Sequence, residues 1–377
     1  MKIVLAPDSF KESMSAPVAA AAMARGVRQV FPDAECLEVP MADGGEGTTE
    51  ALLAGLGGQW REVATVNALG EPITARYGLT ADGTAVIESA ASNGLGLIPP
   101  ERRNIMASNT VGVAALMRDA FDAGAQRLVM GLGGSATNDC GAGLLVGLGA
   151  KLLDAGGAEV APLPAELDKV ARIDLSGVDP RVAQVPVKLA CDVTNPLLGP
   201  NGASAVFGPQ KGATPELVQV LDAKLAVFAD ALEAATGLSL REHPGAGAAG
   251  GLGAAFLALR AQMNRGVALV VEASRLEEKL AGATLCFTGE GSLDEQTLSG
   301  KTPAGVAEAA TKAGVPCVAF TGRLGPGAEK LVGNGFAAVV PILPGLSDLP
   351  TALAEGEANL ERSVATAMRL LALSGAT

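Results

Sequence analysis

The chain opens with MKIVLAPDSFKES (residues 1–13), and this stretch decides the fold class. Its apolar run at 3–5 predicts a short strand, which Pro7 ends. Ser15 can cap a helix that carries Pro17 in its first turn. A strand followed directly by a helix is the first half of a β-α-β unit, so the opening predicts a parallel sheet.

The same pattern continues to about residue 60 and returns in the last hundred residues. Further strands are expected at 36–41, 284–288, 316–321 and 336–340. Helices are expected at 46–55, 303–313, 327–333 and 350–372. Two β-α units at the start and three at the end add up to a five-stranded, doubly wound α/β sheet. One domain should therefore comprise residues 1–60 plus 281–377.

The middle of the chain, residues 61–280, is expected to be a second α/β domain inserted into the first. Its apolar runs predict strands of its own at 84–88, 127–131 and 187–191. A length of 377 residues suits two domains, at about 150 residues per domain.

Composition excludes several classes of protein. A net charge of −12 argues against a nucleic-acid partner, because an acidic surface repels phosphate backbones. The apolar start is too short for a signal peptide, and no run is long enough to predict a membrane span. Five cysteines without a C-x-x-C pair favour reduced thiols in a cytoplasmic protein. Oligomeric state stays open, a homodimer included.

Charged side chains follow the predicted strands of the first domain. In a doubly wound sheet, ligands bind at the carboxyl ends of the strands. With strand order 2-1-3-4-5, one rim would carry three carboxylates and three cations: Asp8, Asp43, Glu290, Lys11, Lys301 and Arg323. Carboxylates beside cations suit a magnesium-phosphate site, and a solvated rim of charges is the alternative. We assign the three carboxylates as the expected metal ligands.

Two glycine-rich segments, 131–136 and 245–250, satisfy the pattern G-x-G-x-x-G/A. They leave open an NAD-binding protein, with Asp154 near the position of a ribose-binding acid. The first segment has a second interpretation, because it lies between a strand and a predicted helix. Backbone N–H groups and hydroxyls at such a place can cradle phosphate, which would involve Gly133, Gly134, Ser135, Thr137 and Asn138. Helix capping by 137–139 is the plainer alternative.

The inserted domain has two more polar clusters, at 191–196 and 207–212. Asp192 follows an apolar strand and is well placed to face a cleft. Phosphoryl transfer needs a group that orients the acceptor hydroxyl. Because His243 is the only histidine and lies in a polar turn, an aspartate is the economical choice for that role.

Together these segments resemble the bacterial glycerate kinase family of galactarate and glyoxylate catabolism. The resemblance covers essentially the whole chain and is carried by residues 1–13, 42–48, 133–139, 191–196, 208–212, 244–251 and 288–291. It implies a flavodoxin-like domain interrupted by a second α/β domain. It also implies ATP-dependent phosphorylation of D-glycerate to 2-phosphoglycerate, with ATP and Mg²⁺ required.

The resulting hypothesis places glycerate in a cleft between the domains. Its carboxylate would bind Lys11 and neighbouring hydroxyls, and the expected substrate contacts are Ser9, Lys11, Asn195 and Arg323. Asp192 would orient or deprotonate the C2 hydroxyl, while Lys211 or Lys301 offsets charge on the transferred group. The domain that binds adenine stays open, as does the ligand of 133–139.

Three alternatives remain at the level of sequence. The first is a kinase that phosphorylates C3 and gives 3-phosphoglycerate. The second is an NAD-dependent hydroxy-acid dehydrogenase, and the third is a non-catalytic protein that binds sugar acids.

Overall fold

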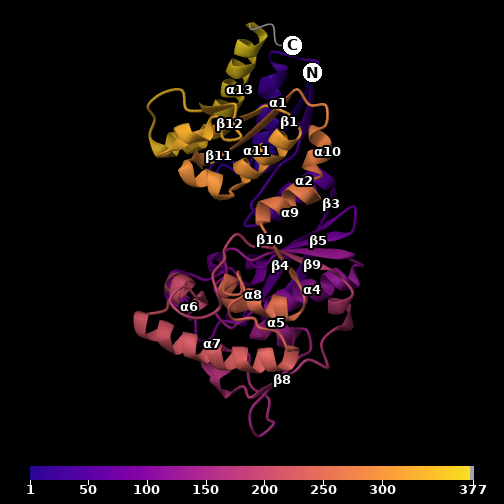
Figure 1. Ribbon diagram of the computed structural model, residues 1–377, viewed down its shortest axis with the longest axis vertical. Helices are drawn as coiled ribbons and strands as arrows, with labels where there is room; N and C mark the ends of the chain where they lie inside the picture. The colour runs from indigo at the N-terminus through magenta and orange to yellow at the C-terminus, as the bar shows by residue number, and fades with distance from the viewer. Residues whose placement is uncertain (374–377) are drawn as a thin grey trace. The chain divides into compact units, whose positions relative to one another are not determined.

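The computed structural model describes residues 1–373, so the last four residues of the predicted segment 281–377 lie outside it (Figure 1). The chain forms two compact units. The first unit comprises Met1–Asp43, Glu50–Gly57 and the chain from Val267 onward. The second comprises Gly44–Thr49 and Gly58–Gly266. No helix in the described part of the chain is long and apolar enough to cross a membrane.

The first unit is built on a five-stranded sheet whose neighbouring strands are all parallel. Its order is β13-β12-β11-β1-β2, which confirms the predicted order 2-1-3-4-5. The strands are β1 (Lys2–Leu5), β2 (Glu35–Glu38), β11 (Leu285–Leu293), β12 (Cys317–Leu324) and β13 (Ala338–Pro341). The opening strand therefore lies in the middle of the sheet, between β2 and β11.

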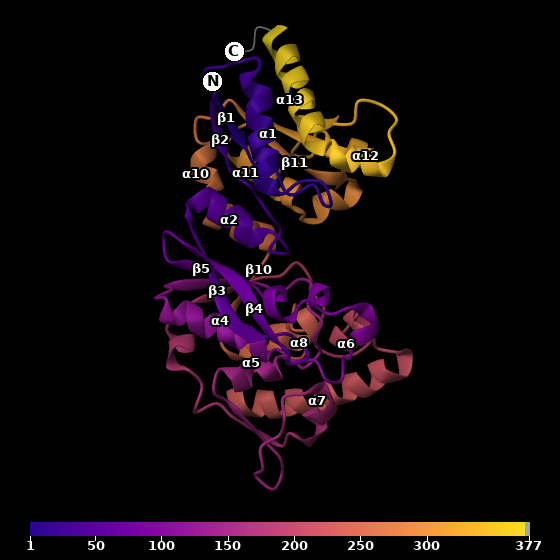
Figure 2. The same cartoon turned by 180° about the vertical axis from the view of Figure 1, so that it is seen from behind.

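Helices cover both faces of this sheet (Figure 2). On one face, α1 (Ala16–Arg28) packs against α13 (Gly356–Leu373), because Met23 and Val27 share a core with Leu360 and Val364. Arg25 joins the two helices through ion pairs of 2.6 and 2.7 Å. On the other face, α11 (Thr302–Lys312) contacts β11 and β12. The remaining helices are α2 (Thr48–Leu56), α9 (Gly266–Ala273), α10 (Leu276–Leu280) and α12 (Leu349–Ala354).

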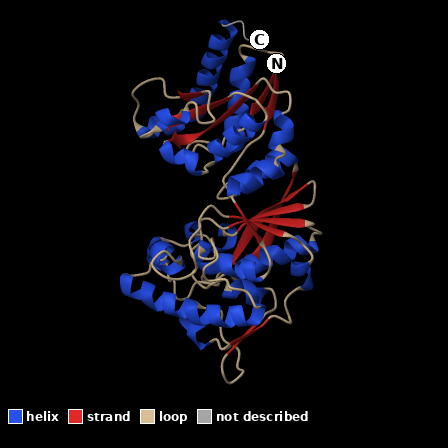
Figure 3. Ribbon diagram, viewed as in Figure 1, coloured by secondary structure: helices blue, strands red, loops and turns tan. Residues whose placement is uncertain are grey.

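The second unit is built on a six-stranded mixed sheet in the order β10-β9-β6-β5-β4-β3 (Figure 3). Its parallel strands are β5 (Thr84–Glu88), β6 (Arg127–Gly131), β9 (Val187–Ala190) and β10 (Gln262–Asn264). An antiparallel edge is added by β3 (Gly58–Val66) and β4 (Pro72–Thr80). A separate hairpin pairs β7 (Lys151–Leu153) with β8 (Arg172–Asp174).

Six α-helices of the second unit surround a large apolar core that includes Tyr77, Phe228 and Phe256. They are α3 (Ala90–Asn93), α4 (Val111–Asp122), α5 (Ala142–Gly147), α6 (Ala203–Phe207), α7 (Pro215–Thr236) and α8 (Ala248–Ala258). Both units thus combine helices with parallel strands, as expected for two α/β domains.

The local predictions needed small corrections. β2 ends at Glu38 rather than at 41, just before the Val39-Pro40 step. The helix expected over 327–333 is a single 3-10 turn, Ala328–Leu331. The long helix expected over 350–372 is divided at Glu355 into α12 and α13. These differences follow from short-range signals that leave the ends of elements poorly defined.

After the second unit, the chain returns to the first unit at Val267, whereas the sequence predicted this boundary near 281. At this boundary, Val267 of α9 lies against Gly305 of α11. A Cβ built on Gly305 would lie 2.4 Å from the Val267 side chain, so only glycine allows this approach. The short loop 44–49 belongs to the second unit, where the Thr49 N–H donates to Glu88 Oε1 at 2.9 Å.

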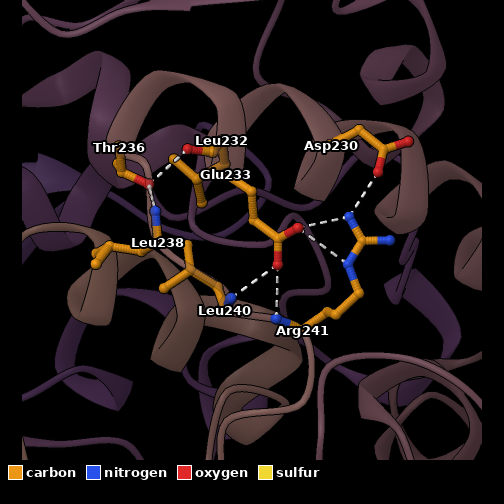
Figure 4. A network of polar contacts seen from close by, with 7 residues as sticks. All are labelled: Asp230, Leu232, Glu233, Thr236, Leu238, Leu240 and Arg241. Atoms are coloured by element: carbon orange, nitrogen blue, oxygen red, sulfur yellow. Dashed lines mark hydrogen bonds and ion pairs between the residues drawn. The ribbon is translucent and has the colours of Figure 1, made fainter.

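A charged network stabilises the end of the longest helix, α7 (Figure 4). Glu233 Oε1 accepts from the backbone N–H groups of Leu240 and Arg241, at 2.7 and 3.0 Å. The Arg241 guanidinium donates to both Glu233 and Asp230. The Arg241 carbonyl in turn accepts from the Leu197 N–H. This network therefore connects the end of α7 to the segment that follows β9.

We predict that Gly250→Ala destabilises the protein far more than Gly237→Ala. Both glycines have nearly the same left-handed φ, +69° and +68°. A Cβ on Gly250 would lie 1.9 Å from the Thr137 carbonyl oxygen, whereas nothing lies within 4 Å of one on Gly237. Gly237→Ala should cost about 1 kcal/mol from backbone strain alone, and Gly250→Ala at least about 3 kcal/mol. Urea unfolding measures both, and equal losses would contradict the close contact.

Candidate functional site

The first unit contains a pocket of about 1010 Å³ at the carboxyl ends of its strands. Seven residues singled out from the sequence line it: Asp8, Ser9, Lys11, Asp43, Glu290, Lys301 and Arg323. The strand order accounts for this, because β1, β11 and β12 are neighbours and end at the same edge. The pocket thus collects carboxylates and cations from both ends of the chain, from Asp8 to Arg323.

Two carboxylates of the pocket are largely buried. Burial raises the pKa of Asp8 to about 6, although the nearby Thr302 hydroxyl and the Ser9 N–H, at 2.6 Å, stabilise the charged form. Burial raises the pKa of Glu290 to about 7, and the charges of Asp8, Asp294 and Asp43 add to that rise. The Lys301 ammonium opposes it from 3.8 Å. Burial is thus the main cause of both raised pKa values, and repulsion between neighbouring carboxylates adds to it.

The donor set fits a magnesium ion that is shared with phosphates. Glu290 Oε1 is buried and receives no hydrogen bond. Among the described residues, no group of three or more Asp, Glu, His or Cys side chains converges as a complete metal site. Asp8, Asp43 and Glu290 therefore line one pocket without forming a cage of protein ligands. Mg²⁺ commonly takes one or two carboxylates and completes its shell with water and substrate phosphates.

One wall of the pocket is apolar, and the sequence reasoning missed it. Leu324, Ile342, Leu349 and Leu353 come from the ends of β12 and β13 and from α12. The signal was the run Pro341-Ile342-Leu343 directly after a predicted strand, which a search for charged strand ends ignores.

In the second unit, Lys211 is 2% exposed and joins two of the predicted motifs. Its ammonium donates to Ser135 Oγ at 3.1 Å and to the Thr137 carbonyl at 2.7 Å. Burial lowers the pKa of Lys211 to about 7, while the charge of buried Asp139 opposes that shift. Lys211 therefore holds the 133–139 loop from inside the unit.

The 133–139 loop lies between β6 and a helix, which confirms its predicted place in the chain. The next helix, α5, starts only at Ala142 and is six residues long. Gly133 and Gly134 are exposed, whereas Ser135, Thr137 and Asn138 are buried. Thr137 Oγ1 accepts from Asn93, and the Asn138 amide donates to Ser204 Oγ. The polar side chains of this loop thus contact other protein groups.

Asp139 has the capping role that was the plainer alternative for this segment. Its carboxylate accepts from the N–H groups of Thr110, Gly141 and Gly143, at 2.9 to 3.1 Å, and from the Thr110 hydroxyl. Burial raises the pKa of Asp139, and these four hydrogen bonds counter the rise.

Asp192 lies two residues beyond β9 and is exposed. Its Oδ1 accepts from the Gly266 N–H at 3.0 Å. A Cβ on Gly44 would lie 2.4 Å from Ala190 Cβ and 3.0 Å from Gly266 Cα. The segments through which the chain enters and leaves the second unit therefore meet beside Asp192. Asn195 is nearby in sequence and donates through its amide to the Asn201 carbonyl.

Comparison with known proteins identifies the family. The model of the glycerate kinase family matches residues 3–372. Glycerate kinase of Bacillus subtilis (strain 168) is 47% identical over 365 residues, which cover 96% of each chain. Glycerate 2-kinase of Escherichia coli (strain K12) is 44% identical over the same length and coverage. A crystal structure from Salmonella typhimurium LT2, provisionally named glycerate kinase 2, has a TM-score of 0.92 at 42% identity and is covered completely.

The chain belongs to the glycerate kinase family. The prediction of a glycerate kinase, a phosphotransferase with an alcohol acceptor, is confirmed. Membership in a kinase family also implies the use of ATP. The dehydrogenase and the non-catalytic binding protein are accordingly set aside.

We predict that Lys211 makes stability rise with pH between about 7 and 10.5. The unfolded lysine keeps its proton up to about 10.4, whereas the folded one loses it near 7. The unfolded state thus binds more protons in this window, so the free energy of unfolding increases by up to about 1.4 kcal/mol per pH unit. Lys211→Met should lack this contribution in urea unfolding series.

Lys224→Met is the matched control, because the Lys224 ammonium pairs with partly exposed Asp168. It should retain the pH slope of the unsubstituted protein. Parallel curves for Lys211→Met and the unsubstituted protein would show that Lys211 stays charged in the folded state.

Proposed function

We propose that the protein transfers the γ-phosphoryl group of ATP to the C2 hydroxyl of D-glycerate and releases 2-phosphoglycerate. The observation that carries this proposal is the pocket of the first unit, where the largely buried Asp8 and Glu290 lie with three cations at the carboxyl ends of parallel strands. A relative that is 44% identical is named glycerate 2-kinase, which supports C2 over C3. The first unit's strand order is that of flavodoxin-like sheets, which bind ligands at this edge.

Charge complementarity supports the binding roles in this pocket. Glu290, Asp8 and Asp43 would hold a magnesium ion, which neutralises charge on the ATP phosphates when bound. Ser9, Lys11 and Arg323 would bind the anionic groups of the substrates, namely the ATP phosphates and the glycerate carboxylate. Lys301 is partly exposed and has only long ion pairs of 3.6 and 3.8 Å. It is therefore better suited than buried Lys211 to offset charge on the transferred group.

In the second unit, we assign the acceptor side of the reaction to Asp192. The Gly266 N–H donates to Oδ1, which orients the exposed carboxylate at the end of β9. A carboxylate can accept the proton of the attacking hydroxyl or fix its orientation. Asn195 would contact glycerate through its amide oxygen. Lys211 would act indirectly by ordering the loop that contains Gly133 and Gly134.

The position of phosphorylation is tested with coupled enzymes. Purified protein, D-glycerate and MgATP are coupled to enolase, pyruvate kinase and lactate dehydrogenase, with and without phosphoglycerate mutase. We expect a signal without the mutase, because 2-phosphoglycerate is the substrate of enolase. EDTA in a direct assay of ADP should abolish turnover. A signal that requires the mutase would instead establish C3 as the acceptor.

We predict that Asp192→Asn lowers kcat at least about 100-fold, on the scale of general base catalysis, with a modest change in either KM. Asparagine keeps the oxygen that accepts from Gly266 and removes the proton acceptor. Asp154→Asn is the control, because Asp154 is also a partly exposed aspartate that accepts from backbone N–H groups. It should turn over normally. Near-normal kcat in Asp192→Asn would remove Asp192 from the mechanism.

A further inference from the structure

The pocket of the first unit is lined by charged side chains at some strand ends and by apolar side chains at others. Asp8 and Glu290 lie at the ends of β1 and β11. Leu324, Ile342 and Leu349 lie at the ends of β12 and β13 and on α12. Arg323 directly precedes Leu324 on β12, and the Leu353 carbonyl accepts from Ser13 Oγ at 2.7 Å, so the apolar side chains adjoin the charged ones around one pocket.

Two leucines of the apolar wall are exposed beside buried Ile342, which costs free energy unless a ligand covers them. Leu324 is 47% exposed and Leu349 is 67% exposed, although both line the pocket. Contiguous exposed apolar side chains in a soluble protein often mark a binding site. Neighbouring strands are separated by about 4.8 Å, so Leu324, on the strand next to that of Glu290, is within reach of a ligand that contacts the carboxylates.

Glycerate does not account for this wall. Each of its three carbons carries a hydroxyl or a carboxylate, and burying such groups against leucine without hydrogen bonds is unfavourable. The pocket, at about 1010 Å³, is at the top of the usual range of about 300–1,000 Å³ for small-molecule sites. It therefore has room for a larger ligand that is anionic at one end and flat and apolar at the other.

We propose that the purine ring of ATP binds on the wall formed by Leu324, Ile342, Leu349 and Leu353, with its phosphates toward Lys301 and Glu290. This inference rests on the proposed role of the pocket in binding ATP. It assigns the base to the first unit, which the sequence left open. Binding of the base relies on apolar contact with side chains from β12, β13 and α12, whereas the ends of β1 and β11 bind the phosphates.

The test substitutes two wall residues and one matched neighbour. Leu349→Gln and Leu324→Gln make the wall polar without adding charge. Leu346→Gln is the control, because Leu346 is fully exposed in the same loop and does not line the pocket. ADP affinity is measured by calorimetry with Mg²⁺, and inorganic tripolyphosphate is used as a competitor that carries the charges of ATP without its base.

We expect ADP affinity to fall about tenfold in both wall variants and less than twofold in Leu346→Gln. The inhibition constant of tripolyphosphate and the KM for glycerate should change less than twofold in all three. Unchanged ADP affinity in both wall variants overturns the inference. Equal losses for ADP and tripolyphosphate also overturn it, because the leucines would then support the phosphate site. A rise confined to the glycerate KM would place glycerate on the wall instead.

ADP binding needs no turnover, so this test is independent of the position of phosphorylation. Product at C3 would refute the proposed regiochemistry and leave the calorimetric result intact. Failure of the unsubstituted protein to bind ADP would overturn the purine site directly. Thermal unfolding of each variant confirms that the compared proteins are equally folded.

Discussion

The site depends on the pairing of the first strand with a strand that is almost 300 residues away in the sequence. β1 and β11 are parallel neighbours, and the ladder continues past β1 where the Asp8 N–H donates to the Gly289 carbonyl at 2.8 Å. The buried Thr288 hydroxyl donates to the Ala6 carbonyl beside it. These bonds fix the backbone that leads into Asp8 and Glu290. Two carboxylates are thereby kept close together at one edge of the sheet, although their mutual repulsion opposes it.

The second unit uses buried polar groups differently. Lys211 and Asp139 are both fully enclosed, and each makes its hydrogen bonds to neighbouring loops and helix ends. Enclosed charges of this kind are costly, so their value lies in specifying one arrangement of the loop between them. The exposed glycines of that loop then present backbone N–H groups from a rigid frame. In the proposed function, the first unit would supply charged side chains, whereas the second would supply an ordered backbone and Asp192.

The fold could be predicted in outline because it follows from local patterns. Apolar runs such as 3–5 and 127–131 both became strands, and the β-α repeat predicted that they pair in parallel, whereas the order 2-1-3-4-5 was assumed. The charged residues at strand ends could be assembled for the same reason. The features that could not be predicted depend on three-dimensional packing. One is the contact of Val267, in α9, with Gly305 of the first unit. Another is the burial of Lys211, which lies in a polar stretch of sequence.

The net charge of the whole chain does not represent the balance of charges in its pocket. A net charge of −12 would repel both ATP and glycerate if it were spread evenly. Lys11, Lys301 and Arg323 are instead gathered in one pocket, and the carboxylates beside them oppose bare anions more than cation-bound ones. Under the proposed function, a pocket with this balance would favour a nucleotide that arrives with a divalent cation over free phosphate. The same carboxylates that raise one another's pKa would then contribute to selectivity for the metal-bound substrate.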